Sequence, residues 1–270
     1  MNNTHRSRDI IIHVYTICWN ESKFLHYFLN YYLNIVNVDH IFVYDNQSTD
    51  LSQEIVKSYK NTTLIEYDTN NQIRDDVYLQ IKNHEWKKYS RGKNVDLVFI
   101  VDVDEILYHS TTSGLRGYLQ QLRDTMHSSF DIIKPTGYQM CAPDFRETFT
   151  YDPLELSCVG KSDEDFSKLA IFNPDRISDI NYFAGCHKCD PISTRSSPVV
   201  TLFNTGVKLL HYKYVYGVDY LIERYKLYQQ RLSDINKVHG WGKHYLQKIE
   251  EIKIQYADAE KDVVSVIQCD

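Results

Sequence analysis

Short apolar runs alternate with amphipathic segments through the first part of the chain. The strand-sized runs, rich in β-branched and aromatic side chains, are residues 10–16, 40–44, 64–67 and 97–101. The segments between them, with apolar side chains at helical spacing, are residues 22–33, 51–59 and 73–88. Strands separated by helices of this length are typical of βαβ units with parallel strands. The pattern predicts an α/β fold with a Rossmann-like first half.

The second part of the chain is less regular. Its strand-sized runs are residues 132–135, 169–172 and 207–210. Residues 218–238 have the periodicity of one long amphipathic helix, and the tail from 241 to 269 predicts a final helix and a weak strand. No G-x-G-x-x-G motif follows the first strand, which argues against dinucleotide binding.

Composition narrows the class of protein. The chain has 270 residues, of which 43% are hydrophobic and 24% are charged, as in ordinary globular domains. There are 30 Lys and Arg against 36 Asp and Glu, and the net charge of −6 disfavours a nucleic-acid partner. No apolar stretch reaches the roughly 18–20 residues of a transmembrane helix. The six scattered cysteines, without a signal-peptide pattern, are expected to be reduced thiols of a cytoplasmic protein.

The sharpest chemical signal is the acidic segment Asp-Val-Asp-Glu at residues 102–105, directly after an apolar run. In a strand, Asp102 and Asp104 would share one face. At the carboxyl end of a central parallel strand, both would point into the ligand crevice of the sheet. Burying three carboxylates is costly unless a cation offsets their charge, and Mg²⁺ or Mn²⁺ with a diphosphate suits such oxygen donors. A solvated strand end with fortuitous acids is the alternative.

A second polar segment, residues 45–50, follows the run at 40–44. Asp45 is placed to accept hydrogen bonds from a nucleobase or a ribose. Ser48 and Asp50 fit the N-cap of the next helix, whose N-terminus favours anions. A plain capping turn would explain Ser48 and Asp50, but it would not explain why Asp45 closes the strand.

Together these motifs resemble those of family 2-like glycosyltransferases with the GT-A fold, in the sub-group with a D-x-D-E motif. The matching segments are residues 18–21, 44–50 and 102–105 and, as in bacterial surface-polysaccharide members, residues 168–174, 185–187, 209–213 and 231–245. The resemblance covers about residues 10–245 and implies a mixed central sheet. It also implies a catalytic domain at residues 1–215 and a helical extension packed on it at 216–270. The nucleotide-binding half would lie at about 10–110 and the acceptor half at about 111–215.

The resemblance implies residue roles as well. The nucleotide-sugar site would contain Thr16, Asn20, Glu21, Asp45, Asp75, Asn83, Asp102 and His244. Asp102, Asp104 and His211 would hold Mn²⁺ or Mg²⁺, since a neutral imidazole suits such a site. Taken by itself, His211 is as well explained as a polar residue at a strand end. Arg224 and Arg231 would cover the diphosphate or the acceptor, unless they are only the polar face of an amphipathic helix.

An inverting transfer also needs a carboxylate that accepts the proton of the acceptor hydroxyl. The resemblance places this residue after the D-x-D motif, in an acidic pair. Glu164 and Asp165 are the nearest match, and Asp144 is the rival. For any one of the three taken by itself, a solvated loop acid is the favoured interpretation.

The sequence therefore predicts a metal-dependent glycosyltransferase of the hexosyltransferase type. It would move a sugar from a nucleoside diphosphate sugar, with UDP favoured, to a glycan or lipid-linked acceptor of polysaccharide biosynthesis, and it could act at the inner face of a membrane. A nucleotidyltransferase is one alternative, but its Gly-rich basic loop is missing from residues 18–21. A non-catalytic binding module on a GT-A scaffold is the other, although binding alone would not need three metal donors.

Overall fold

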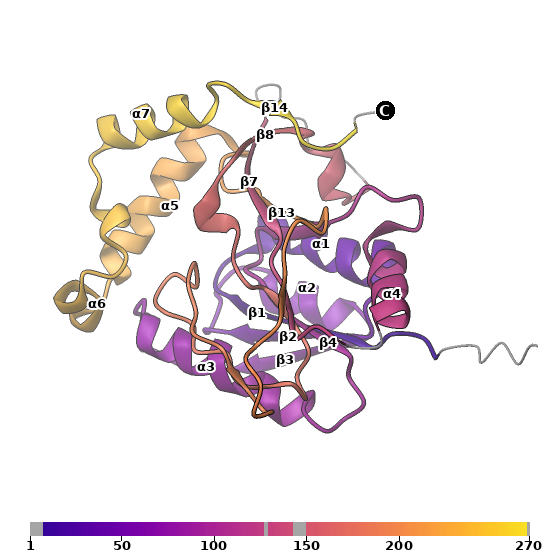
Figure 1. Cartoon of the computed structure of the whole chain (residues 1–270). Helices are drawn as coiled ribbons and strands as arrows, with labels where there is room; N and C mark the ends of the chain where they lie inside the picture. Colours follow the sequence, from indigo (N-terminus) through magenta and orange to yellow (C-terminus); the bar gives the residue numbers. More distant parts are fainter. Residues whose placement is uncertain (1–7, 127–128, 143–149, 269–270) are drawn as a thin grey trace, which may run out of the picture.

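The central element of the fold is a seven-stranded sheet with the order β12-β6-β9-β4-β1-β2-β3 (Figure 1). The computed structural model describes residues 8–126, 129–142 and 150–268. The strands of this sheet are β1 (Ile12–Cys18), β2 (His40–Asp45), β3 (Thr62–Glu66), β4 (Leu97–Ile100), β6 (Ile132–Ile133), β9 (Ile171–Phe172) and β12 (Thr201–Leu202). Strands β1 to β4 form a parallel set, whereas β9 is antiparallel to both β4 and β6. The predicted α/β class, with a mixed central sheet, is confirmed.

A second, five-stranded sheet has the order β14-β8-β7-β13-β5. Its strands are β5 (Glu105–Tyr108), β7 (Thr136–Cys141), β8 (Val159–Ser162), β13 (Lys208–His211) and β14 (Val264–Ser265), and a separate ribbon pairs β10 (Ile177–Asp179) with β11 (Ile192–Ser193). Strand β13 is parallel to β7 and antiparallel to β5. The sequence pattern does not predict β5, β7 or β8, because these strands are short and polar residues or glycines such as Gly137 interrupt two of them.

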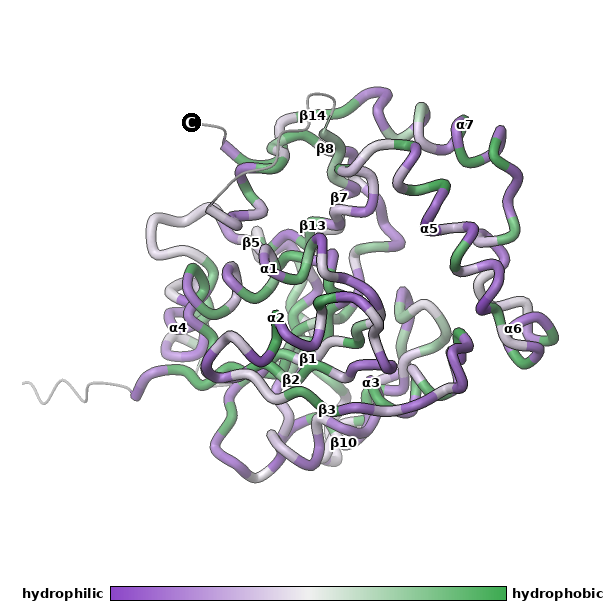
Figure 2. The backbone as a smooth tube through the Cα atoms, turned by 180° about the vertical axis from the view of Figure 1, so that it is seen from behind, coloured by the Kyte–Doolittle hydropathy of each residue, from purple (hydrophilic) through white to green (hydrophobic). Residues whose placement is uncertain are grey.

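Helices cover both faces of the central sheet. They are α1 (Ser22–Asn30), continued by a π-helical turn (Tyr31–Ile35), α2 (Ser52–Ser58), α3 (Asp75–Tyr89) and α4 (Gly114–Met126). Successive side chains of a strand point to opposite faces of the sheet. Val14 of β1 therefore packs on the face covered by α1, α2 and α4, and Tyr15 packs on the other face, where Trp86 of α3 lies. The sequence pattern does not predict helix α4. Seen from behind, the hydrophobic segments gather around the central strands (Figure 2).

The C-terminal helices form an arm beside the two sheets (Figure 1). The prediction of a single helix over residues 218–238 is wrong. Helix α5 (Gly217–Arg231) ends at Leu232, whose backbone is extended, and a separate helix, α6 (Asp234–His239), begins two residues later. The new start has a local cause, since the Ser233 side chain accepts a hydrogen bond from the Asn236 amide as an N-cap. Helix α7 (Ile249–Ala259) then leads into β14. Across the described ranges, no helix has the length and apolar character to cross a membrane.

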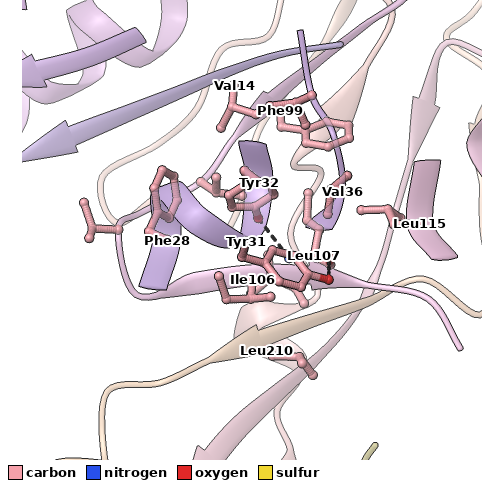
Figure 3. Close-up of a cluster of buried hydrophobic side chains, with 14 of the residues drawn as sticks. Val14, Phe28, Tyr31, Tyr32, Val36, Phe99, Ile106, Leu107, Leu115 and Leu210 are labelled. Atoms are coloured by element: carbon pink, nitrogen blue, oxygen red, sulfur yellow. Dashed lines mark hydrogen bonds between the residues drawn. The ribbon is translucent and has the colours of Figure 1, made fainter. Parts of the chain in front are cut away.

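Two tyrosines of the π-helical turn fasten β5 to the first helix. The Tyr32 hydroxyl accepts from the Leu107 amide at 2.9 Å and lies 3.1 Å from the carbonyl of Glu105, to which it donates. The Tyr31 hydroxyl donates to the Leu107 carbonyl at 2.9 Å. Figure 3 shows both rings packed among aliphatic side chains around β5. These bonds fix the start of β5, where the acidic motif lies.

Tyr32→Phe should lower the free energy of unfolding by about 1–3 kcal/mol, because it leaves two buried backbone groups unpaired. Tyr31→Phe, which removes one hydrogen bond from the same turn, should lower the free energy of unfolding by less. Urea denaturation of the two variants measures the difference. An equal effect of both substitutions would contradict the role given to Tyr32.

Candidate functional site

A cavity of about 510 Å³ opens where the ends of β1, β4 and β13 meet helix α5. Its walls combine acidic and aromatic side chains from segments far apart in the sequence. Seven residues of the predicted site line it: Glu21, Asp75, Asp102, Asp104, Asp165, His211 and His244. The fold therefore gathers residues from both halves of the chain around one space.

The acidic motif forms a turn and not the end of a strand. Strand β4 ends at Ile100, and the Glu105 amide donates to the Asp102 carbonyl at 3.0 Å across the turn. The Glu105 carboxylate folds back and accepts from the Asp102 amide at 2.8 Å. The expectation that the two aspartates share one strand face is therefore wrong. Both nevertheless line the cavity, because the turn points into it.

Strand pairing brings His211 to the acidic turn across more than a hundred residues of sequence. In the antiparallel register of β13 with β5, His211 lies opposite Glu105, and the Tyr212 amide donates to the Asp104 carbonyl at 2.8 Å. The His211 Nε2 atom consequently lies 3.2 Å from Asp104 Oδ2.

The orientation of the His211 ring is fixed from two sides. Its Nδ1 atom lies 2.8 Å from Gln139 Oε1, and the Phe166 ring stacks on it with centroids 4.1 Å apart. Gln139 Nε2 donates a hydrogen bond to Asp163 at 3.4 Å, so Gln139 Oε1 is left to accept a hydrogen bond from Nδ1–H of His211. This arrangement leaves Nε2 facing the Asp104 carboxylate, as in metal-ligating histidines whose other nitrogen is bonded to a neighbour.

The donor set fits a divalent cation in part. Asp104 offers a carboxylate and His211 an imidazole nitrogen to the same point, and both are donors that Mn²⁺ accepts. Asp102 does not join them, and among residues 8–126, 129–142 and 150–268 no group of three His, Cys, Asp or Glu side chains is arranged around one metal position. The protein thus supplies two donors, and the remaining positions would fall to diphosphate oxygens and water, as is usual for Mg²⁺.

Asp102 is instead paired with two lysines. Its Oδ1 atom lies 2.5 Å from Lys82 Nζ, and its Oδ2 atom lies 3.5 Å from Lys168 Nζ. Lys168 also pairs with Glu105 at 2.6 Å. Although burial favours protonation, these lysines hold the pKa of the Asp102 carboxyl below its usual range.

Asp75 lies at the start of α3, on the wall of the cavity. Its backbone amide donates to the Asn236 side chain at 3.1 Å. Burial, reinforced by the nearby Asp102 charge, raises the pKa of its carboxyl to about 6. A carboxyl group with such a pKa in a cavity is a candidate for proton transfer or for contact with a polar substrate.

The C-terminal arm forms one wall of the cavity. Arg224 pairs with Glu21 and donates to the Asn20 carbonyl at 2.8 Å. The Arg231 guanidinium lies 3.2 Å from the centre of the Trp19 ring, and the Arg231 carbonyl accepts from the Ile73 amide at 2.7 Å. The arm is thereby tied to the loops that follow β1 and β3.

Four residues expected at the nucleotide-sugar site do not line the cavity: Thr16, Asn20, Asp45 and Asn83. Asn20 connects the turn after β1 to the next loop, since its Oδ1 accepts from the Thr49 amide at 2.7 Å. Asn83 binds the backbone of Tyr182 through both amide atoms. These two side chains therefore shape the loops around the cavity.

Asp45 is fully buried at the end of β2. Its Oδ2 atom accepts from the Ser48 amide at 2.9 Å and from Gln53 Nε2 at 2.8 Å. Its Oδ1 atom and the Thr16 hydroxyl have no hydrogen-bond partner within the described part of the chain. A buried carboxylate oxygen without a partner is costly, and a ligand that donates to it would offset that cost.

Two of the candidate proton acceptors, Glu164 and Asp165, lie within the described residues and have different surroundings. Asp165 lines the cavity, while its carbonyl accepts from His187 at 2.7 Å. Glu164 is outside the cavity lining, with its side chain 81% exposed and paired with Lys134. Asp144 lies outside the described residues.

Sequence reasoning missed several cavity residues. Lys213 lines the cavity, and burial lowers the pKa of its ammonium group to about 8. Its Nζ atom lies 5.1 Å from the centre of the Tyr225 ring. Lys82 is seven residues, or two helical turns, after Asp75, so helical spacing places both on one face of α3. No local feature of the sequence marks Lys168 as a partner of the acidic turn or Gln139 as a partner of His211.

The expected state of the cysteines needs one correction. Cys18, Cys141, Cys186 and Cys189 are free thiols. Cys158 is disulfide-bonded, so the expectation of six reduced thiols is wrong for this residue.

No protein-family model and no curated protein matches the sequence. Among solved structures, the chain is similar to TarS from S. aureus, with 15% identity in both comparisons. The match covers 81% of this chain and 63% of TarS 1–349 with a TM-score of 0.37, and 94% of this chain and 44% of a second TarS structure with a TM-score of 0.40. The chain thus spans less than two thirds of either TarS structure.

Two other similar structures cover less of this chain. One is glucosyl-3-phosphoglycerate synthase from Mycobacterium tuberculosis in complex with Mn²⁺, UDP and glucosyl-3-phosphoglycerate. The match has 14% identity and a TM-score of 0.31, and it covers 48% of this chain and 44% of that chain. The other is 4-diphosphocytidyl-2C-methyl-D-erythritol synthase from Anaerococcus prevotii. That match has 12% identity and a TM-score of 0.33, and it covers 61% of this chain and 70% of that chain. At such low scores, function is inferred from this chain's own site.

The raised pKa of Asp75 predicts a pH-dependent change in stability. The folded protein holds the Asp75 proton up to about pH 6, whereas the unfolded chain releases it near 3.8. The folded state then binds more protons between these values, so this group makes stability fall as pH rises. Asp75→Asn should therefore gain stability over the natural protein between pH 4 and 7.

Asp76→Asn is the matched control. The Arg74 side chain lowers the pKa of Asp76, so its carboxylate adds stability that is lost on acidification. This variant should lose stability relative to the natural protein as pH rises. Urea denaturation at several pH values measures both trends, and equal signs for the two variants would contradict the Asp75 assignment.

Proposed function

We propose that this chain is a metal-dependent glycosyltransferase of the GT-A type. It transfers a sugar, with inversion, from a UDP-sugar to a hydroxyl group of a glycan or lipid-linked acceptor. The observation that carries the proposal is the pair Asp104–His211, two converging metal donors on the wall of a cavity large enough for a nucleotide sugar. The proposal takes residues 1–215 as the catalytic unit and 216–270 as an extension that supplies one wall of the cavity.

Asp104 and His211 would hold Mn²⁺ or Mg²⁺. The cation supplies positive charge against the diphosphate, which stabilises UDP as a leaving group. Lys213 adds a second positive charge on the same wall of the cavity. It forms no ion pair with a carboxylate in the described part of the chain, so its ammonium group is free to contact a phosphate oxygen.

Asp45 is the candidate for recognition of the nucleobase. Its unpaired Oδ1 atom can accept an N–H of a uracil ring, while its other oxygen stays fixed by Ser48 and Gln53. Because Asp45 is fully buried, the contact requires movement of the residues that cover it. Tyr67 and Arg231 also keep buried polar atoms without a hydrogen-bond partner among the described residues.

Of the two candidate proton acceptors within the described residues, Asp165 is the better placed, since it lines the cavity. In the proposed reaction, the acceptor oxygen forms a bond to the anomeric carbon as the bond from that carbon to the diphosphate breaks. The acceptor proton passes to the Asp165 carboxylate. The aromatic wall, which includes Tyr220 and Tyr228, offers apolar surface to a sugar ring.

The decisive experiment measures UDP binding and sugar transfer with and without Mn²⁺. Asp104→Asn should lower kcat/KM at least about 100-fold, because metal stabilisation of the transition state is worth several kcal/mol. Asp234→Asn, with a side chain 96% exposed on α6, is the control and should behave as the natural protein does. UDP binding that is absent or independent of Mn²⁺ would refute the proposal, and turnover of a nucleoside triphosphate would favour a nucleotidyltransferase.

Asp45→Ala should weaken UDP binding roughly tenfold or more, the equivalent of about 1.4 kcal/mol, because it removes the acceptor for the base. The control is Gln53→Ala, which removes one hydrogen bond to Asp45 but keeps its carboxylate. Calorimetric titration with UDP in the presence of Mn²⁺ compares the two. Equal weakening in both variants would show that Asp45 acts only by holding its loop.

A further inference from the structure

The acidic turn carries its own counter-charges. Lys82 reaches it from α3, and Lys168 reaches it from the segment before β9. Both are almost inaccessible, with side chains 10% and 2% exposed, and together they contact Asp102 and Glu105 at 2.5–3.5 Å. We call Lys82, Lys168, Asp102 and Glu105 the lysine clamp.

The charges of Asp102 and Glu105 balance without a metal ion. Two ammonium groups face these two carboxylates within the lysine clamp, whereas the third carboxylate, that of Asp104, faces the imidazole of His211. An unpaired buried carboxylate would destabilise the fold strongly, and the two lysines remove this cost for Asp102 and Glu105. These two acids therefore do not by themselves require a cation.

The clamp also engages both oxygens of Asp102. Oδ1 contacts Lys82 and Oδ2 contacts Lys168, so a cation that approached Asp102 would meet two ammonium groups. Asp104 is different, because its nearest partner is the imidazole nitrogen of His211, which can itself be a ligand. The two aspartates of one motif thus have different side-chain partners.

We propose that Lys82 and Lys168 are positioning residues that hold Asp102 out of the metal coordination sphere. The inference rests on the proposed function, since it concerns the metal that this reaction would use. The protein alone then offers only Asp104 and His211, which makes its own affinity for Mn²⁺ low. The diphosphate completes the site, so the cation binds together with the nucleotide.

The test is Mn²⁺ binding, measured by electron paramagnetic resonance on the full chain without nucleotide. Lys82→Met removes one ammonium group and releases Asp102 Oδ1 as a third donor. The number and charge of the ligands set metal affinity, so this variant should bind Mn²⁺ roughly fivefold or more tightly than the natural protein. A lysine that only supported the fold would not raise metal affinity when removed, and the controls below measure what the loss of a positive charge contributes by itself.

Two controls separate a released ligand from the loss of a positive charge. Lys213→Met removes a cavity cation that pairs with no carboxylate in the described ranges, and it should change Mn²⁺ affinity less. In an Asp102→Asn background, Lys82→Met should give no larger gain than Lys213→Met, because no carboxylate is released. Asp102→Asn alone should leave Mn²⁺ affinity within about threefold, whereas Asp104→Asn should weaken it about tenfold or more.

The outcomes distinguish this inference from the proposed function. Unchanged or weaker Mn²⁺ binding by Lys82→Met, or a gain that persists in the Asp102→Asn background, would overturn the lysine clamp alone. Failure of the natural protein to bind Mn²⁺ even with UDP would overturn the metal-dependent function, while a new Mn²⁺ site in Lys82→Met would still support the clamp. Circular dichroism confirms folding, and Lys82→Gln, which also removes the ammonium group but keeps a hydrogen-bond donor, replaces Lys82→Met if that variant fails to fold.

Discussion

The antiparallel pairing of β13 with β5 is the constraint on which the candidate site depends. It sets His211 opposite Glu105 and draws the Tyr212 amide to the Asp104 carbonyl. A shift of one residue would turn His211 to the other face of the sheet and separate it from Asp104. The hydroxyl of Tyr32 holds the start of β5 against the first helix, so the register and the hydrophobic core are fixed together.

Charge compensation around the acidic turn follows from its burial. Glu105 is 1% exposed, and its carboxylate both caps the Asp102 amide and pairs with Lys168. The third acid of the motif thus has a structural task, which is to hold the turn that presents the two aspartates. This division explains how three carboxylates can lie side by side in the fold: each has its own partner, and only Asp104 has a partner that can share a metal.

The C-terminal arm forms a wall of the cavity that joins segments far apart in the sequence. Arg224 is joined to the turn after β1, and Arg231 to the loop after β3. Asp45 keeps an unpaired oxygen, whose cost persists only because the surrounding structure holds the carboxylate in place. Under the proposed function, a ligand that donates to this oxygen would offset the cost.

The sequence by itself determined the parallel half of the fold, because buried strands and amphipathic helices each have a local period that a single segment displays. It also singled out Asp104 and His211, which the structure brings together. It did not reveal β5 and β7, whose short runs carry too few apolar residues, or the break at Ser233, where one capping side chain ends a helical period. Only the tertiary structure decided which lysines neutralise Asp102 and Glu105, because such pairings depend on strand register and helix packing between segments far apart in the chain, which no local pattern records.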